Sequence, residues 1–205
     1  MNPERRGTKA DLFDTATAHA LLTELAERLA ARRVPSRIYV VGGAAMALAY
    51  YDEGERRLTN DIDASLAPAA LITDEAVAIA AEHGLRPGWL NAKAVGFLPA
   101  HGRQEGVTII TRDHVRVEVA PPKLLLAMKL RAARLGRDDD DIAVLLRRCD
   151  IRSIDEARSL LHDCYDGEEP FTDKANMIVQ AALAEYRVMS GRPPFTLAAM
   201  ARRPS

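Results

Sequence analysis

Residues 39–46 of the chain read YVVGGAAM, and residues 57–63 read RLTNDID. The first stretch is typical of a buried strand that passes through a glycine pair, Gly42–Gly43, into a short helix. The second stretch predicts another strand, with Asp61 and Asp63 on it. Because side chains two residues apart in a strand point to the same face, we expect the two aspartates to lie side by side.

Two neighbouring carboxylates repel each other, and a cation between them relieves the repulsion. Hard divalent ions such as Mg²⁺ take oxygen ligands of this kind, usually together with substrate phosphates. A glycine pair lets a phosphate approach the backbone, and the N-terminus of the helix that follows favours an anion. The segment therefore predicts a joint site for a phosphate and a metal ion, with Mg²⁺ expected and Mn²⁺ as the alternative.

The composition sets broad limits on the class of protein. A chain of 205 residues is long enough for one domain with a helical extension. Its net charge of −1 provides no overall basic field for nucleic acid, although a local arginine patch would suffice. Cys149 and Cys164 show no metal-ligand spacing, and no segment approaches the roughly 20 apolar residues of a membrane span. We expect a reduced, cytoplasmic protein without a membrane partner.

Hydrophobic periodicity predicts an α+β (mixed α/β) fold, in which a small mixed sheet with flanking helices precedes a C-terminal helical bundle. The expected strands are 37–41, 61–66, 107–111 and 114–119. The expected helices are 14–33, 44–51, 74–83, 122–135, 138–149, 153–164 and 171–189.

The same pattern predicts that Asp14 and Asp74 cap the first and third helices, and that residues 85–106 are irregular. We divide the chain into a core at 1–120, a helical region at 121–190 that completes the site, and a flexible tail at 191–205.

The glycine pair followed by Asp61-Ile62-Asp63 resembles the core signature of the nucleotidyltransferase superfamily, which has the polymerase-beta-like fold. The resemblance implies that the glycine turn holds a nucleoside triphosphate and that Asp61 and Asp63 hold Mg²⁺ ions. It also implies a third carboxylate on a neighbouring strand, as metal ligand or proton acceptor, and Glu118 is the candidate. The alternative for Glu118 is an exposed face of an edge strand, which it would share with Arg116.

The second half of the chain is similar to a narrower group, the AbiEii and MenT-type nucleotidyltransferase toxins and their DUF6036 relatives. The matching features are Lys129 in an apolar helix and an acidic run, Asp138–Asp141, at the start of the next helix. Arg57 and Thr59 fit the pattern that precedes the aspartates in these relatives. The matches run from about Tyr39 to Leu146, over half of the chain.

The resemblance implies that Lys129 contacts the nucleotide phosphates and that Asp138 or Asp141 is a site aspartate. Each feature also has a simpler interpretation. Lys129 could be a lysine whose stem is buried and whose ammonium group reaches the surface. The acidic run could only complement the helix dipole.

The implied function is transfer of a nucleoside monophosphate from a triphosphate to a hydroxyl, with release of pyrophosphate. For the acceptor the resemblance implies a tRNA 3′ end, and for the biology a toxin restrained by a cognate antitoxin. Two alternatives remain, namely a protein or small-molecule acceptor and a non-catalytic scaffold that binds a nucleotide or a partner. Replacing Asp63 or Lys129 by Ala is expected to abolish transfer and leave the fold intact.

Overall fold

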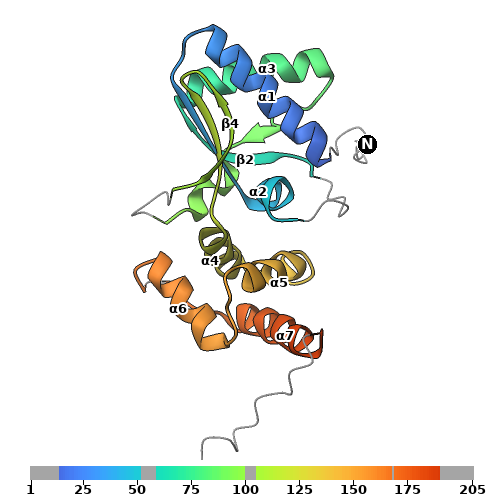
Figure 1. Cartoon of the computed structure of the whole chain (residues 1–205), viewed down its shortest axis with the longest axis vertical. Coiled ribbons are helices and arrows are strands. Elements are labelled where there is room, and N and C mark those ends of the chain that lie inside the picture. The colour runs from blue at the N-terminus through green and yellow to red at the C-terminus, as the bar shows by residue number, and fades with distance from the viewer. Residues whose placement is uncertain (1–13, 52–58, 100–104, 168, 190–205) are drawn as a thin grey trace, which may run out of the picture.

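The computed structural model describes residues 14–51, 59–99, 105–167 and 169–189. They form a five-stranded mixed sheet with flanking helices, followed by a layer of four helices (Figure 1). The helices are α1 (Thr15–Ala31), α2 (Gly42–Ala49), α3 (Ala69–His83), the 3-10 helix η2 (Lys93–Phe97), α4 (Pro122–Ala132), α5 (Asp139–Arg148), α6 (Ile154–Cys164) and α7 (Asp173–Met189). The strands are β1 (Ser36–Val41), β2 (Ile62–Ala67), β3 (Leu90–Asn91), β4 (Val107–Arg112) and β5 (Val115–Val119). None of the described helices is both long and apolar enough to cross a membrane.

The strand order in the sheet is β3-β2-β1-β5-β4. β1 lies antiparallel to β2 and parallel to β5, and β2 lies parallel to β3. The register pairs Val41 with Asp63 and Asp63 with Asn91. The end of β1, where the glycine turn begins, is therefore next to the second aspartate.

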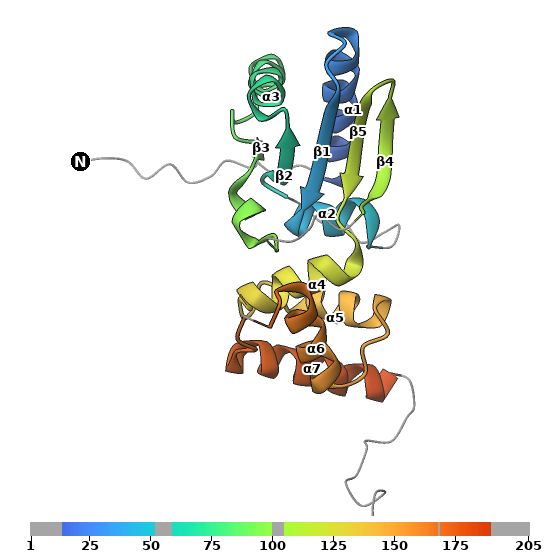
Figure 2. The same cartoon turned by 90° about the vertical axis from the view of Figure 1, so that its left-hand side faces the viewer.

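Helices α1 and α3 lie side by side and cover one face of the sheet (Figures 1 and 2). The side of α1 that carries Leu22, Leu25 and Leu29 is completely buried. Burial of each such side chain stabilises the fold by about 1.5–3 kcal/mol. Asp14 caps α1 as predicted, because its carboxylate accepts a hydrogen bond of 2.9 Å from the backbone N–H of Thr17.

Helix α2 connects the two layers, because it packs against β1 and β2 on one side and against α4 on the other. A single cluster of buried apolar side chains runs from α1 through the sheet to α7. The layers are thus joined by a continuous core, which holds the glycine turn at the start of α2 between them.

Three local predictions need correction. α3 begins at Ala69 and not at Asp74, because Pro68 starts the helix and the buried residue Ile72 lies in its first turn. Asp74 is exposed within this helix and caps nothing. Residues 85–106 are not wholly irregular, since they contain β3 and η2, and α2 begins two residues earlier than predicted, at Gly42. The predicted tail at 191–205 lies outside the described residues.

Candidate functional site

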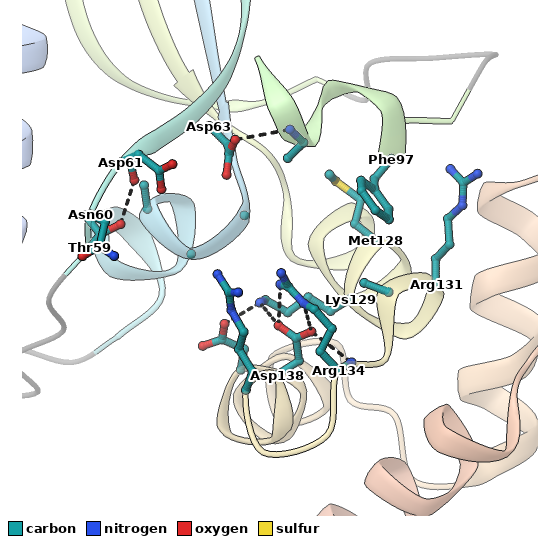
Figure 3. A pocket seen from close by; sticks show the side chains of 17 residues that line it. Thr59, Asn60, Asp61, Asp63, Phe97, Met128, Lys129, Arg131, Arg134 and Asp138 are labelled. Carbon is teal, nitrogen blue, oxygen red and sulfur yellow. Dashed lines mark hydrogen bonds and ion pairs between the residues drawn. The ribbon is translucent and has the colours of Figure 1, made fainter. Parts of the chain in front are cut away.

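A cavity of about 510 Å³ lies between the sheet and the helical layer. Its walls come from α2, the start of β2, η2, α4 and the segment that leads into α5 (Figure 3). The lining residues are Gly42, Gly43, Ala44, Thr59, Asn60, Asp61, Asp63, Ala94, Phe97, Met128, Lys129, Arg131, Ala132, Arg134, Arg137, Asp138 and Asp141. The cavity thus brings together most of the residues predicted as site residues.

Asp61 and Asp63 form the acidic wall of the cavity, with Ile62 between them fully buried, as the alternation predicts. Asp61 lies just before β2, and Asp63 is within it. Burial raises the pKa of Asp63, and the neighbouring charge of Asp61 raises it further. The fold therefore keeps two like charges together at a cost.

Among the described residues, the side-chain contacts of this pair come from β3 and the segment after it. The side-chain amide of Asn91 donates a hydrogen bond of 3.1 Å to Asp61, and the backbone N–H of Ala94 donates one of 3.2 Å to Asp63. The ammonium group of Lys93 is 3.5 Å from Asp61, but its side chain is 77% exposed. These contacts orient the carboxylates, while within the described residues Asp63 makes no ion pair.

The glycine turn lies directly beside Asp63. Gly42 has a φ of +68°, which favours glycine, and a Cβ at this position would be 3.6 Å from Oδ2 of Asp63. Gly43 has open space where a Cβ would stand. No side chain caps the N-terminus of α2, so its first backbone N–H groups are available to an anion in the cavity.

Lys129 lies on the opposite wall and is 6% exposed. Its ammonium nitrogen is 2.8 Å from Oδ1 of Asp138 and 2.6 Å from Oδ2 of Asp141, and both aspartates are completely buried. Both candidates for the site aspartate therefore lie in the cavity and bind the same lysine. Lys129 holds these two carboxylates together, which neither simpler interpretation of the sequence foresees.

Arg134 binds this buried cluster from its solvent-exposed side. Its guanidinium group donates hydrogen bonds of 2.8 Å and 3.0 Å to the two oxygens of Asp138. Burial alone would raise the pKa of Asp138, but the hydrogen bond from Arg134 and the charge of Lys129 outweigh it and lower the pKa to about 2. The hydroxyl of Tyr51 donates to Asp141 at 2.5 Å and so joins the end of α2 to α5.

Arg57 and Thr59 were predicted as site residues from the pattern that precedes the aspartates. Thr59 lines the cavity, and its hydroxyl donates a hydrogen bond of 2.7 Å to the backbone carbonyl of Asp61. Its observed role is to fix the acidic wall. Arg57 lies outside the described residues.

The prediction that Glu118 shares the site needs correction. Its carboxylate is buried and lies 2.5 Å from Arg37, which is on the neighbouring strand β1, and 3.6 Å from Arg116. Glu118 is not among the residues that line the cavity. It pairs in register with Tyr39, two residues before the strand position that is opposite Asp63. Glu118 therefore lies on the same face of the sheet as Asp63, but β1 and an offset of two residues separate the two side chains.

Among the residues of this site that were not predicted as site residues, four come from one segment that runs from β3 to η2: Asn91, Lys93, Ala94 and Phe97. The sequence WLN at 89–91 gave a weak indication of a role for Asn91, because a polar amide side chain there follows two apolar residues. Ala94 contributes a backbone N–H group, and the residue type does not reveal such a role. The exposed ring of Phe97 could be assigned to the cavity only once η2 was placed against α4.

Asp61 and Asp63 fit a divalent cation by the chemistry of their donors, which are carboxylate oxygens beside the open space over Gly43. Within the described residues no group of three or more His, Cys, Asp or Glu side chains could hold a metal ion. Two protein carboxylates leave most ligand positions of Mg²⁺ to water and to phosphate oxygens, which is the usual arrangement for this ion.

The chain was compared with protein-family models, with curated proteins and with solved structures, and none of the three comparisons found a match. What is known of the site therefore comes from its residues and their geometry.

Proposed function

We propose that this protein is a Mg²⁺-dependent nucleotidyltransferase. The observation that carries the proposal is the arrangement of one cavity, in which Asp61 and Asp63 face Lys129 and Arg134 across the glycine turn of α2 (Figure 3). Such a cavity offers a place for a metal ion on one wall, cations for phosphate on the other, and exposed backbone N–H groups between them. The nucleotidyltransferase fold itself is part of this proposal.

In the proposed reaction, the oxygen of an acceptor hydroxyl forms a bond to the α-phosphorus of a nucleoside triphosphate. The bond from that phosphorus to the oxygen bridging to the β-phosphate breaks, and pyrophosphate leaves. The hydroxyl proton passes to solvent or to a cavity carboxylate. When bound, Mg²⁺ would stabilise the negative charge that develops on the phosphate oxygens.

The protein contributes mainly position and charge. Asn91, Ala94 and Thr59 fix the acidic wall, and Asp61 and Asp63 would hold the metal ion there. The guanidinium group of Arg134, whose side chain is 49% exposed, supplies positive charge to the phosphates. Lys129 supports this wall by holding Asp138 and Asp141 in place.

For the acceptor we propose a tRNA 3′ end, and for the biology a cytoplasmic toxin with a cognate antitoxin. Both rest on the resemblance of residues 39–146 to the AbiEii and MenT-type toxins. The structure adds that Arg131, Arg134 and Arg137 all line the cavity, where a nucleic-acid backbone could bind. Of the other arginines in this half, Arg148 donates a hydrogen bond to the backbone carbonyl of Tyr50.

The test is to incubate the protein with total tRNA, Mg²⁺ and each α-³²P-labelled nucleoside triphosphate in turn. An Asp61→Ala/Asp63→Ala variant is the negative control, and Asp140→Ala, an exposed aspartate outside the cavity, is the matched control. We expect label on tRNA with the wild-type and Asp140→Ala proteins only. Label on protein or on a small molecule would change the acceptor, and no label on any component of a cell lysate would contradict the proposed activity.

A further inference from the structure

One end of the cavity differs from the charged walls. Phe97, Met128 and Arg131 lie together there, on the side away from Asp61 (Figure 3). Phe97 is the last residue of η2, and the other two residues are on α4. This end offers a flat ring and a guanidinium group, where the rest of the cavity offers charged pairs and backbone.

Phe97 is 42% exposed as a residue, whereas Met128 beside it is 5% exposed. Among the large hydrophobic side chains that are exposed in the described residues, Phe97 alone lines this cavity. Leaving an apolar ring in water forgoes the stabilisation that its burial would give. An exposed ring inside a cavity therefore indicates a surface that a ligand covers.

The ring is held from behind by a fixed set of contacts. The guanidinium carbon of Arg131 lies 5.7 Å from the centroid of the Phe97 ring and 4.9 Å from that of Tyr165. Glu169 binds Arg131 at 2.7 Å, and the hydroxyl of Tyr165 donates a hydrogen bond to the backbone carbonyl of Phe97. These contacts restrain the backbone of Phe97 and place Arg131 over its ring.

We propose that Phe97, supported by Arg131 and Tyr165, is a platform on which a nucleobase stacks. Every nucleobase has a flat π face that can pack on an aromatic ring, and a nearby arginine strengthens the contact. The inference rests on the proposed function for the placement of the phosphates, which would lie between the acidic wall and Arg134. One nucleotide would then contact the charged walls with its phosphates and the platform with its base.

A stacking contact tolerates all bases, because it uses their faces and not their hydrogen-bonding edges. The platform should therefore strengthen binding of the four nucleoside triphosphates to a similar degree. The base could belong to the triphosphate or to the last nucleotide of an RNA acceptor, and both present the same chemistry to Phe97.

The test compares the dissociation constants of the wild-type protein and the Phe97→Ala variant by calorimetric titration in Mg²⁺. The ligands are α,β-methylene analogues of the four nucleoside triphosphates, inorganic tripolyphosphate, and a short single-stranded RNA with a free 3′ hydroxyl. Leu71→Ala is the matched control, since Leu71 is also 42% exposed but lies on α3, away from the cavity. Phe97→Trp tests rescue, because it restores a flat ring.

We expect Phe97→Ala to weaken binding of all four analogues about tenfold, and to leave tripolyphosphate binding unchanged. Leu71→Ala should change the affinity for neither the analogues nor tripolyphosphate. Phe97→Trp should bind the analogues as tightly as the wild-type protein does. Weakening of RNA binding alone would assign the platform to the base of the acceptor. Equal weakening of analogues and tripolyphosphate, or no change in any ligand, would overturn the proposal.

These outcomes separate the platform from the transfer activity. Base-dependent binding without transfer of label would uphold the platform and contradict the enzyme. If label is transferred but Phe97→Ala binds every ligand as tightly as the wild-type protein, the enzyme is upheld and the platform is contradicted. If the wild-type protein binds none of these ligands, both proposals are wrong.

Discussion

Two pairs of aspartates line the same cavity, and the pairs differ in their burial and in the cations that bind them. Asp138 and Asp141 are completely buried, and Lys129 binds both. Asp61 and Asp63 are partly exposed, and among the described residues the one cation paired with them is the exposed Lys93, at 3.5 Å from Asp61. Within the described residues, the first pair is compensated by buried and bound cations, whereas the second pair is mostly uncompensated.

The pKa values of Asp138 and Asp63 shift in opposite directions. Hydrogen bonding and positive charge overcome burial at Asp138 and lower its pKa to about 2, so its ionised form stabilises the fold. Burial and the charge of Asp61 raise the pKa of Asp63, so its ionised form costs stability. In the proposed function, the first pair builds the wall of the cavity and the second pair binds a cation from solution.

The largest effect should follow removal of the cation from the compensated pair. Lys129→Met removes the one cation that binds both buried carboxylates in the described structure, and we expect a loss of about 3 kcal/mol or more in the free energy of unfolding. This revises the expectation that Lys129 can be replaced with the fold intact. Urea denaturation measures the loss, and Lys123→Met, an exposed lysine on the same helix, should change stability by less than about 0.5 kcal/mol. Equal losses in the two variants would contradict the difference between the pairs.

Removing a charge from the uncompensated pair should have the opposite effect on stability. In Asp63→Asn the side-chain oxygen can still accept the hydrogen bond from Ala94, while the repulsion with Asp61 disappears. We expect a gain on the order of 1 kcal/mol in the free energy of unfolding, together with a loss of transfer activity of more than about a hundredfold.

The matched control for Asp63→Asn is Asp140→Asn, in the exposed first turn of α5. It should lower stability slightly, because an acidic residue there favours the helix dipole, and it should keep activity. A destabilised but active Asp63→Asn variant would show that Asp63 is a structural residue.

Acid should weaken the compensated pair at a defined pH. Because the pKa of Asp138 is lower in the folded than in the unfolded state, its stabilising contribution is complete above about pH 4 and is lost as the pH falls toward 2. The contribution is roughly 2 kcal/mol. Denaturation curves between pH 5 and pH 2 should show a smaller loss for Asp138→Asn than for the wild-type protein. Parallel losses in the two proteins would mean that Asp138 does not carry this contribution.

The smallest effects should distinguish the two glycines beside Asp63. Gly42→Ala forces a residue with a Cβ to adopt a φ of +68° and should cost about 1 kcal/mol. Gly43→Ala meets no atom within 4 Å and should leave stability nearly unchanged. If the backbone at Gly43 receives a phosphate, however, this variant should bind tripolyphosphate more weakly. Thermal unfolding and calorimetric titration measure the two properties, and unchanged affinity in Gly43→Ala would remove the glycine turn from the phosphate site.

The sequence predicts the parts of this site that depend on local geometry. The period of a strand places Asp61 and Asp63 together, and a glycine pair between a strand and a helix indicates the turn. The sequence cannot predict which charged side chains of different helices and strands form ion pairs in the folded protein. Glu118 and Asp63 are both acidic residues of predicted strands, and only the register of β1 shows that Glu118 binds Arg37 at a distance from the cavity. The burial of Lys129 between two carboxylates likewise depends on how α4 and α5 pack.

The central claim is that Asp61 and Asp63 bind a metal ion together with a triphosphate, and thermal unfolding tests it most directly. The melting temperatures of the wild-type protein, Asp63→Asn and Asp140→Asn should be measured with a nucleoside triphosphate, in Mg²⁺ and in a chelator. We predict that the triphosphate raises the melting temperature of wild type and Asp140→Asn in Mg²⁺ only, and that it does not raise that of Asp63→Asn. An equal rise in the chelator, an equal rise in Asp63→Asn, or no rise in any protein would contradict the claim.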